Sequence, residues 1–144
     1  MLSKNFSLDE LTHTDTGVSN VPNDEQRSNL VLVACTLLQP VRDEFGPIRV
    51  SSGFRSPEVH AAIKETQGAP TSNTSQHLLG EAADFIPLEA DLETVFQWCK
   101  KNLVFGQLIL EGNLGKRWIH ISLVRVNKPN MMALRFEDGT YRVA

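Results

Sequence analysis

Two histidines and one aspartate of this 144-residue chain are potential metal ligands, and two of the three interrupt otherwise apolar stretches. His77 emerges from a polar segment, and Asp84 follows within residues 82–86 (AADFI), where an unpaired carboxylate would be costly to bury. His120 lies within residues 118–122 (WIHIS), a run typical of a β-strand. Two imidazoles and one carboxylate with an open coordination position are the ligands of a catalytic zinc site. On spacing alone, however, a satisfied core histidine and a capping aspartate explain the same residues, because His-x6-Asp is far less diagnostic than H-E-x-x-H.

The segments that must position these residues predict helices first and mostly strands later. A capping box over residues 7–10 (SLDE) predicts a short helix over residues 8–13. Apolar spacing predicts a long helix over residues 24–45, kinked near Pro40 and stopped by Gly46 and Pro47. Further helices are expected from Ser56-Pro57 to about residue 65 and, capped by Asp91, to residue 101.

Residues 66–76 form a polar stretch without periodicity, which predicts a loop. Gly80, three residues after His77, favours a tight bend or a close backbone approach there. Short strands are expected over residues 48–51, 82–86, 107–110, 118–124, 132–136 and 140–143. The sequence therefore predicts a single α+β domain over residues 1–144, with N-terminal helices packed on a small, mainly antiparallel sheet.

Composition limits the classes of partner. The formal net charge of −3, from 14 basic and 17 acidic residues, argues against a nucleic-acid binder. No stretch approaches the roughly 20 apolar residues of a membrane-spanning helix. Cys35 and Cys99 fall within apolar helical patterns and are expected to be reduced and buried. We expect a monomer without a membrane segment.

Three segments together resemble the M15 family of zinc D-Ala-D-Ala carboxypeptidases, above all its small phage and prophage members. They are S-G-F-R-S-P (52–57), S-Q-H-L-L-G-E-A-A-D-F (75–85) and W-I-H-I-S (118–122), and weaker similarity extends over about residues 5–125. The resemblance implies a Hedgehog/DD-peptidase type of fold and peptidoglycan peptides as the partner. It also implies one Zn²⁺ ion held by His77, Asp84 and His120.

The resemblance also implies residues that bind the substrate. Arg55 matches the family arginine that binds a substrate carboxylate, which a guanidinium can grip with two parallel hydrogen bonds. The structural alternative is a salt bridge, for instance with Glu58. Ser75 and Gln76 are expected to position substrate or to orient His77, although capping of the loop explains them almost as well.

The general base departs from the family pattern. Many family members carry a glutamate within a few residues before the last histidine, whereas this chain has Arg117 there and Glu111 as its nearest upstream carboxylate. A hairpin pairing position 111 with 118 and 109 with 120 would put Glu111 and His120 on one sheet face, and a one-residue slip would separate them. We expect Glu111 to be the base. Glu81 is the rival, with a solvated strand-edge charge as its ordinary interpretation.

These expectations predict zinc-dependent hydrolysis of peptidoglycan stem or cross-link peptides, of the D,D-carboxypeptidase or murein endopeptidase type, as in a phage endolysin. The displaced glutamate leaves open a non-catalytic peptidoglycan-binding or structural phage module on the same fold. Residues 1–13 lack the apolar region of a signal peptide. We therefore expect synthesis in the cytoplasm and action on the cell wall or periplasm, after holin release or as a virion component.

Overall fold

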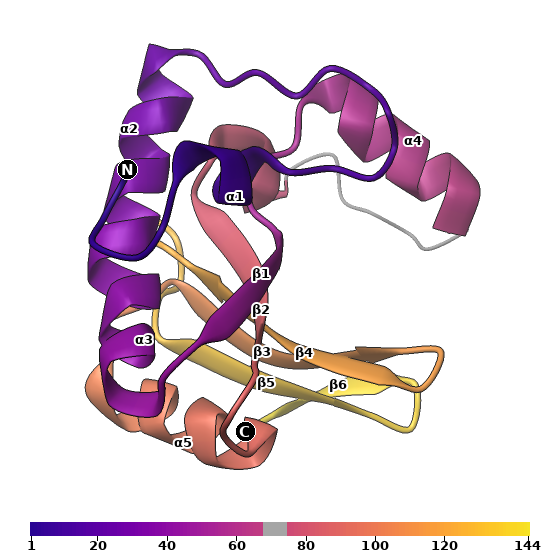
Figure 1. The fold of residues 1–144 in the computed structure, drawn as a ribbon. Helices are drawn as coiled ribbons and strands as arrows, with labels where there is room; N and C mark the ends of the chain where they lie inside the picture. Colours follow the sequence, from indigo (N-terminus) through magenta and orange to yellow (C-terminus); the bar gives the residue numbers. More distant parts are fainter. Residues whose placement is uncertain (68–74) are drawn as a thin grey trace.

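A computed structural model describes residues 1–67 and 75–144 and places helices against a six-stranded sheet (Figure 1). The strand order is β1-β2-β4-β3-β5-β6, and every neighbouring pair is antiparallel except β3 and β5. The predicted α+β class with a mainly antiparallel sheet is confirmed. The strands are β1 (Ile48–Ser52), β2 (Ala82–Pro87), β3 (Gln107–Asn113), β4 (Lys116–Ser122), β5 (Met132–Glu137) and β6 (Thr140–Val143).

The first helix forms where the capping box predicted it. Helix α1 (Leu8–Thr12) begins after Ser7, whose Oγ accepts a hydrogen bond from the backbone N of Glu10. The Glu10 carboxylate in turn accepts from the backbone N of Ser7. The two reciprocal bonds satisfy amide groups that the first helical turn would otherwise leave without a partner.

The long predicted helix is a stack of three segments. Helix α2 (Asp24–Val33) continues through a π-helical turn η1 (Ala34–Leu38) into α3 (Gln39–Phe45). The irregularity lies just before Pro40, where a proline lacks the N–H for the regular bond and its ring crowds the preceding turn. A wide π-turn accommodates both effects, so the kink predicted at Pro40 takes this form.

One side of this stack faces the core, and Cys35 lies on the other. The buried residues recur at helical spacing, and they are Leu30, Val33, Ala34, Leu37, Leu38 and Val41. That spacing turns Cys35 outward, so the prediction that it is buried was wrong, whereas Cys99 is buried as expected. Neither cysteine is in a disulfide.

Two further helices and a short turn complete the described chain. Helix α4 (Pro57–Gln67) follows Ser56, whose Oγ accepts from the backbone N of Val59, and α5 (Leu92–Asn102) is capped by Asp91. The 3-10 turn η2 (Gln76–Leu79) precedes β2. The loop predicted over residues 66–76 falls mostly on residues 68–74, which lie outside the described residues. Within residues 1–67 and 75–144, no helix has both the length and the apolar character needed to cross a lipid bilayer.

One face of the sheet packs against the hydrophobic core, and the other face carries polar residues. The core-facing side chains of β2, β3 and β4 are buried in the same cluster as the inner faces of α2, α3 and α5, and they are Ala83, Phe85, Leu108, Leu110, Ile119 and Ile121. Because successive residues of a strand point to opposite faces, Asp84, Glu111 and His120 share the other face. The helical layer thus fixes the sheet and leaves that face for chemistry.

Candidate metal centre and catalytic residues

The three predicted ligands converge at one point. Asp84 in β2 is the direct cross-strand partner of His120 in β4, and His77 reaches the same point from η2. Oδ1 of Asp84 lies 2.9 Å from Nδ1 of His120 and 3.3 Å from Nε2 of His77. One ligand atom from each residue lies within 4.8 Å of the others, which is the spacing of donors around a single ion. The exposed fraction of the side chain is 4% for His77, 11% for Asp84 and 13% for His120, so the site is largely shielded from solvent.

A backbone carbonyl fixes the tautomer of His77. Its Nδ1 lies 2.7 Å from the carbonyl oxygen of Gly53, which can only accept, so Nδ1 carries the proton and Nε2 presents its lone pair to the site. Orientation of a ligand histidine through its other ring nitrogen is the usual arrangement in metal sites. Gly53 lies so close to α1 that an added Cβ would be 2.3 Å from the carbonyl oxygen of Leu11. Only glycine allows this approach.

The turn that carries His77 is held at both ends. Ser75 Oγ accepts from the backbone N of His77 at 3.3 Å, and the carbonyl of His77 accepts from the backbone N of Arg55 at 3.0 Å. Gly80 ends the turn at a φ of +72°, where a Cβ would meet the carbonyl oxygen of Gln26 at 2.5 Å. The bend and close approach expected at Gly80 are therefore confirmed. Gln76 is buried, and its Nε2 donates to the carbonyl of Leu123 after β4.

Ser75 and Gln76 thus connect the turn to the surrounding framework. These bonds fit the capping alternative, while contact of either side chain with substrate stays a prediction.

Arg55 lies against a metal ligand. Its Nη2 is 3.3 Å from Oδ2 of Asp84, and its Nε donates to Ser52 Oγ at 2.9 Å. The ion pair considered with Glu58 is thus made with Asp84 instead. Since Oδ1 of Asp84 faces the histidines and Oδ2 faces Arg55, the guanidinium orients the carboxylate that completes the site.

The electrostatics favour the protonation states that bind a cation. Burial lowers the pKa of His77, although Asp84 opposes the shift, and this keeps the imidazole neutral. Burial alone would raise the pKa of Asp84, but the imidazoles of His77 and His120 hold it far below its usual range. Neutral imidazole and ionised carboxylate are the forms that coordinate metals. The donor set therefore fits a divalent ion.

Glu111 lies on the face of the sheet that carries the site. The hairpin pairs Glu111 with Trp118 and Ile109 with His120, which is the register expected from the sequence. Burial raises the pKa of Glu111, a hydrogen bond from Tyr141 opposes this shift, and the charges of His120 and Asp84 act on it in opposite directions. The rival Glu81 instead lies 3.6 Å from Nε of Arg125 in an ion pair.

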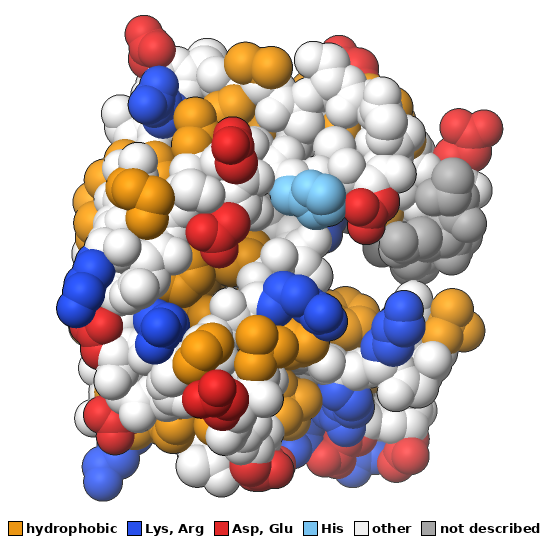
Figure 2. All heavy atoms as spheres, viewed as in Figure 1, with side chains coloured by type: hydrophobic (Ala, Val, Ile, Leu, Met, Phe, Trp, Pro, Cys, Tyr) orange, Lys and Arg blue, Asp and Glu red, His pale blue; other side chains and the backbone are white. Residues whose placement is uncertain are grey.

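One side of the molecule is hollowed. Figure 2 shows a notch on the side where, in Figure 1, α4 faces the projecting β3–β4 hairpin. Neither Ser52 nor Gly53 was assigned a role from the sequence, although both lie in the S-G-F-R-S-P segment. The contacts of Gly53 with Leu11 and His77 join segments distant in the chain, so the glycine two residues before Arg55 was the only local signal.

The comparison with known families covers most of the chain. The family model described as Peptidase M15 matches residues 4–122, which include His77, Asp84, Glu111 and His120. No curated protein matches the chain. The match extends over more than half of the 144 residues and contains the whole candidate metal centre. The chain belongs to the M15 family of peptidases.

Proposed function

We propose that the protein is a zinc-dependent peptidase that hydrolyses peptidoglycan stem or cross-link peptides. One observation carries the proposal: donor atoms of His77, Asp84 and His120 lie within 4.8 Å of one another, with Glu111 on the same sheet face. Two imidazole nitrogens and one carboxylate oxygen form the donor set of catalytic zinc. Zinc bound there would polarise the scissile carbonyl and lower the pKa of a coordinated water.

Glu111 is the general base in this proposal. It would take a proton from the attacking water and deliver it to the amine that leaves. Burial raises the pKa of its carboxyl above the ordinary value, which suits a group that must both accept and return a proton. Its support is the hairpin register, which puts positions 111 and 120 on one face of the sheet.

Arg55 has two tasks in the proposal. Its Nη2 and Nε are used by Asp84 and Ser52, which holds Asp84 in place. A guanidinium has five N–H donors, so further donors remain for a carboxylate of the wall peptide. Binding that carboxylate would fix the scissile bond over the metal and restrict its motion before reaction. Ser75 and Gln76 would shape the adjoining wall of the site.

A role in phage-type lysis extends the same proposal. A protein that reaches the wall through a holin lesion or aboard a virion needs no membrane segment of its own. Infection of host cells by phage with an inactive copy would test this step: plaques should shrink or disappear. Normal plaques together with normal wall degradation would contradict the lytic role and leave the chemistry untouched.

The activity is tested on purified peptidoglycan. New amino groups should appear, disappear with a chelator and return with zinc, and mass spectrometry of the products should show released D-alanine or cleaved cross-links. Glu111→Gln should keep zinc and lose hydrolysis by about 10²-fold or more. His77→Ala should lose both. Glu89→Gln, at an exposed carboxylate beyond the end of β2, is the matched control and should behave as wild type.

A wild-type protein that binds zinc and peptidoglycan but releases no amino groups would refute the enzyme and support a binding module. Full hydrolysis by Glu111→Gln would remove Glu111 from the role of base and leave the metal centre in place.

A further inference from the structure

The last strand of the sheet carries a tyrosine on the same face as Glu111. Tyr141 in β6 lies in one row with Glu111 of β3 on the same face of the sheet, and each of the two side chains shifts the pKa of the other. It is the only tyrosine of the chain. It also follows the segment matched by the family, which ends at residue 122. Family membership therefore says nothing about this residue, and its role has to come from the geometry.

The sheet register explains how two residues on non-adjacent strands meet. The parallel ladder of β3 and β5 runs to Leu110 and Arg135, so Glu111 and Phe136 follow at the same level. Phe136 is paired across β5 and β6 with Tyr141. Two strand spacings separate Tyr141 from Glu111, so their backbones are about 10 Å apart. A tyrosine side chain and a glutamate side chain that extend toward each other can span this distance.

The tyrosine ring is itself supported. The rings of Phe136 and Tyr141 lie 5.1 Å apart between centroids with an angle of 59° between their planes. Such tilted aromatic pairs are favourable and restrict the ring positions. Tyr141 is 55% exposed, so part of its ring remains in solvent.

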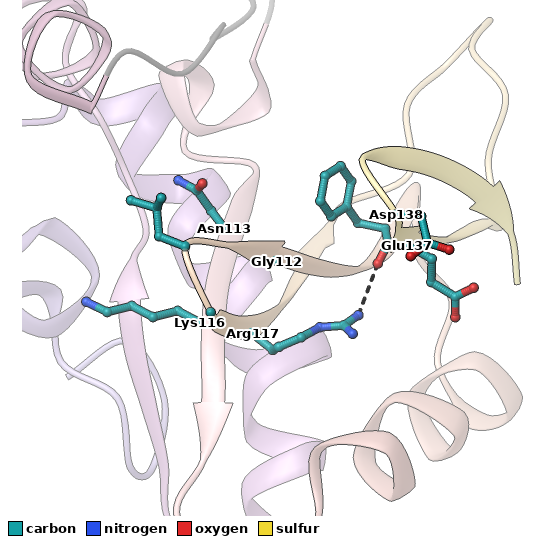
Figure 3. A pocket seen from close by; sticks show the side chains of 9 residues that line it. Gly112, Asn113, Lys116, Arg117, Glu137 and Asp138 are labelled. Atoms are coloured by element: carbon teal, nitrogen blue, oxygen red, sulfur yellow. Dashed lines mark hydrogen bonds between the residues drawn. The ribbon is translucent and has the colours of Figure 1, made fainter.

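The side chain of Arg117 forms a clamp between the backbones of Glu111 and Phe136. Arg117 donates from Nε to the carbonyl of Glu111 and from Nη2 to the carbonyl of Phe136, both at 3.2 Å. Figure 3 shows Arg117 extended across the hollow between the two hairpins, with its bond to the Phe136 carbonyl. The clamp joins β3 to β5 just beyond the end of their ladder. It thereby fixes the spacing over which Tyr141 must reach.

From this arrangement we infer that Tyr141 is a positioning residue for Glu111, holding one carboxylate oxygen so that the other faces the metal centre. The inference rests on the proposed role of Glu111 as base. A glutamate on a strand has three rotatable side-chain bonds, and a bond from a tyrosine hydroxyl selects among its rotamers before substrate arrives. The hydroxyl acts through Glu111 and need not touch the substrate.

Kinetics of the zinc-loaded protein on purified muropeptides test this role. Tyr141→Phe removes the hydroxyl and keeps the ring that contacts Phe136. We expect kcat to fall by about tenfold, the size of one hydrogen bond to a charged group, with KM and zinc content unchanged. Arg142→Gln is the control, because position 142 pairs with Arg135 and therefore points to the opposite face.

A wild-type kcat in Tyr141→Phe would overturn the inference, as would a loss of zinc in proportion to the loss of activity, which would mean a structural role. An inactive wild-type protein is a separate result, since it refutes the proposed function itself.

A second measurement needs no activity. Because Tyr141 is the only tyrosine, the absorbance of tyrosinate reports its ionisation alone. Burial, and then the bond to Glu111, raise the pKa of Tyr141 above its usual value of about 10. Glu111→Gln removes the negative charge, so the pKa should fall, with circular dichroism confirming the fold at each pH. An equal pKa in both proteins would show that the two side chains do not interact, and would overturn the inference.

Discussion

Gly53→Ala should disturb the fold and the metal centre through one steric contact. The new Cβ would lie 2.3 Å from the carbonyl oxygen of Leu11 and 3.0 Å from its carbonyl carbon and Cα. The backbone near residue 53 and α1 must therefore separate by about 0.7 Å, the difference between 2.3 and 3.0 Å, before the contact becomes tolerable. Both neighbours are backbone, so no side chain can rotate away.

The expected loss of stability follows from two terms. Overpacking of this kind costs about 1–3 kcal/mol. The hydrogen bond from the backbone N of Phe54 to the carbonyl of Leu11, now 2.8 Å long, lies in the same contact, and its loss adds about 1 kcal/mol. The free energy of unfolding should fall by about 2–4 kcal/mol, which for a domain of this size lowers Tm by roughly 6–15 °C.

The metal centre should weaken for a separate reason. The carbonyl of Gly53 holds Nδ1 of His77, so a shift of this backbone misplaces the ligand. Loss of such an outer contact reduces metal affinity by about 10- to 100-fold. Thermal unfolding and zinc titration of Gly53→Ala measure the two effects. Gly112→Ala is the control, because its nearest contact is the flexible Arg117 side chain at 3.4 Å. Wild-type Tm and wild-type zinc affinity in Gly53→Ala would refute the steric reasoning.

Three further perturbations probe other parts of the account. Arg55→Lys should reduce hydrolysis by about tenfold or more, because lysine cannot keep both the Asp84 and the Ser52 contact; unchanged kcat/KM would contradict this. Asp91→Ala should lower the urea-measured free energy of unfolding by about 1 kcal/mol through loss of the α5 cap, and an unchanged midpoint would exclude a stabilising cap. In chelator-treated protein, stability should fall as the pH drops below about 6.5, because the pKa of His77 is lower in the fold than in the unfolded chain, which takes up the proton first. Urea midpoints independent of pH between about 8 and 5 would argue against a buried neutral imidazole.

The hairpin register was predictable because it depends on local periodicity, whereas the ligand set was implied by the resemblance of three segments to a known family. A strand repeats every two residues, so one turn between Glu111 and Trp118 fixes which side chains share the face of His120. The segments containing His77 and Asp84 are likewise close in the chain and joined by a bend at Gly80. Local rules were sufficient for the register and for the bend at Gly80, but not for the choice of the three ligands.

The residues that support the site depend on packing between distant segments. The carbonyl of Gly53 meets His77 from a segment that also packs against Leu11 of α1, and Arg55 pairs with Asp84 of β2 and not with the neighbouring Glu58. Tyr141 comes into one row with Glu111 through the parallel pairing of β3 and β5. The pattern of a single strand does not encode such a pairing.

The orientation of Cys35 was missed for a simpler reason. Apolar residues occur on more than one side of α2 and the turn that follows, and Val31 and Leu32 are exposed beside it. The apolar stripe was therefore too broad to identify the buried side by spacing alone.

Anomalous diffraction from crystals of zinc-loaded protein, recorded on both sides of the zinc absorption edge, would show whether the three residues bind a single zinc ion. One peak should lie at about 2.0–2.3 Å from Nε2 of His77, Oδ1 of Asp84 and Nδ1 of His120. A peak elsewhere in the chain, or density for the three side chains with no anomalous signal between them, would contradict it.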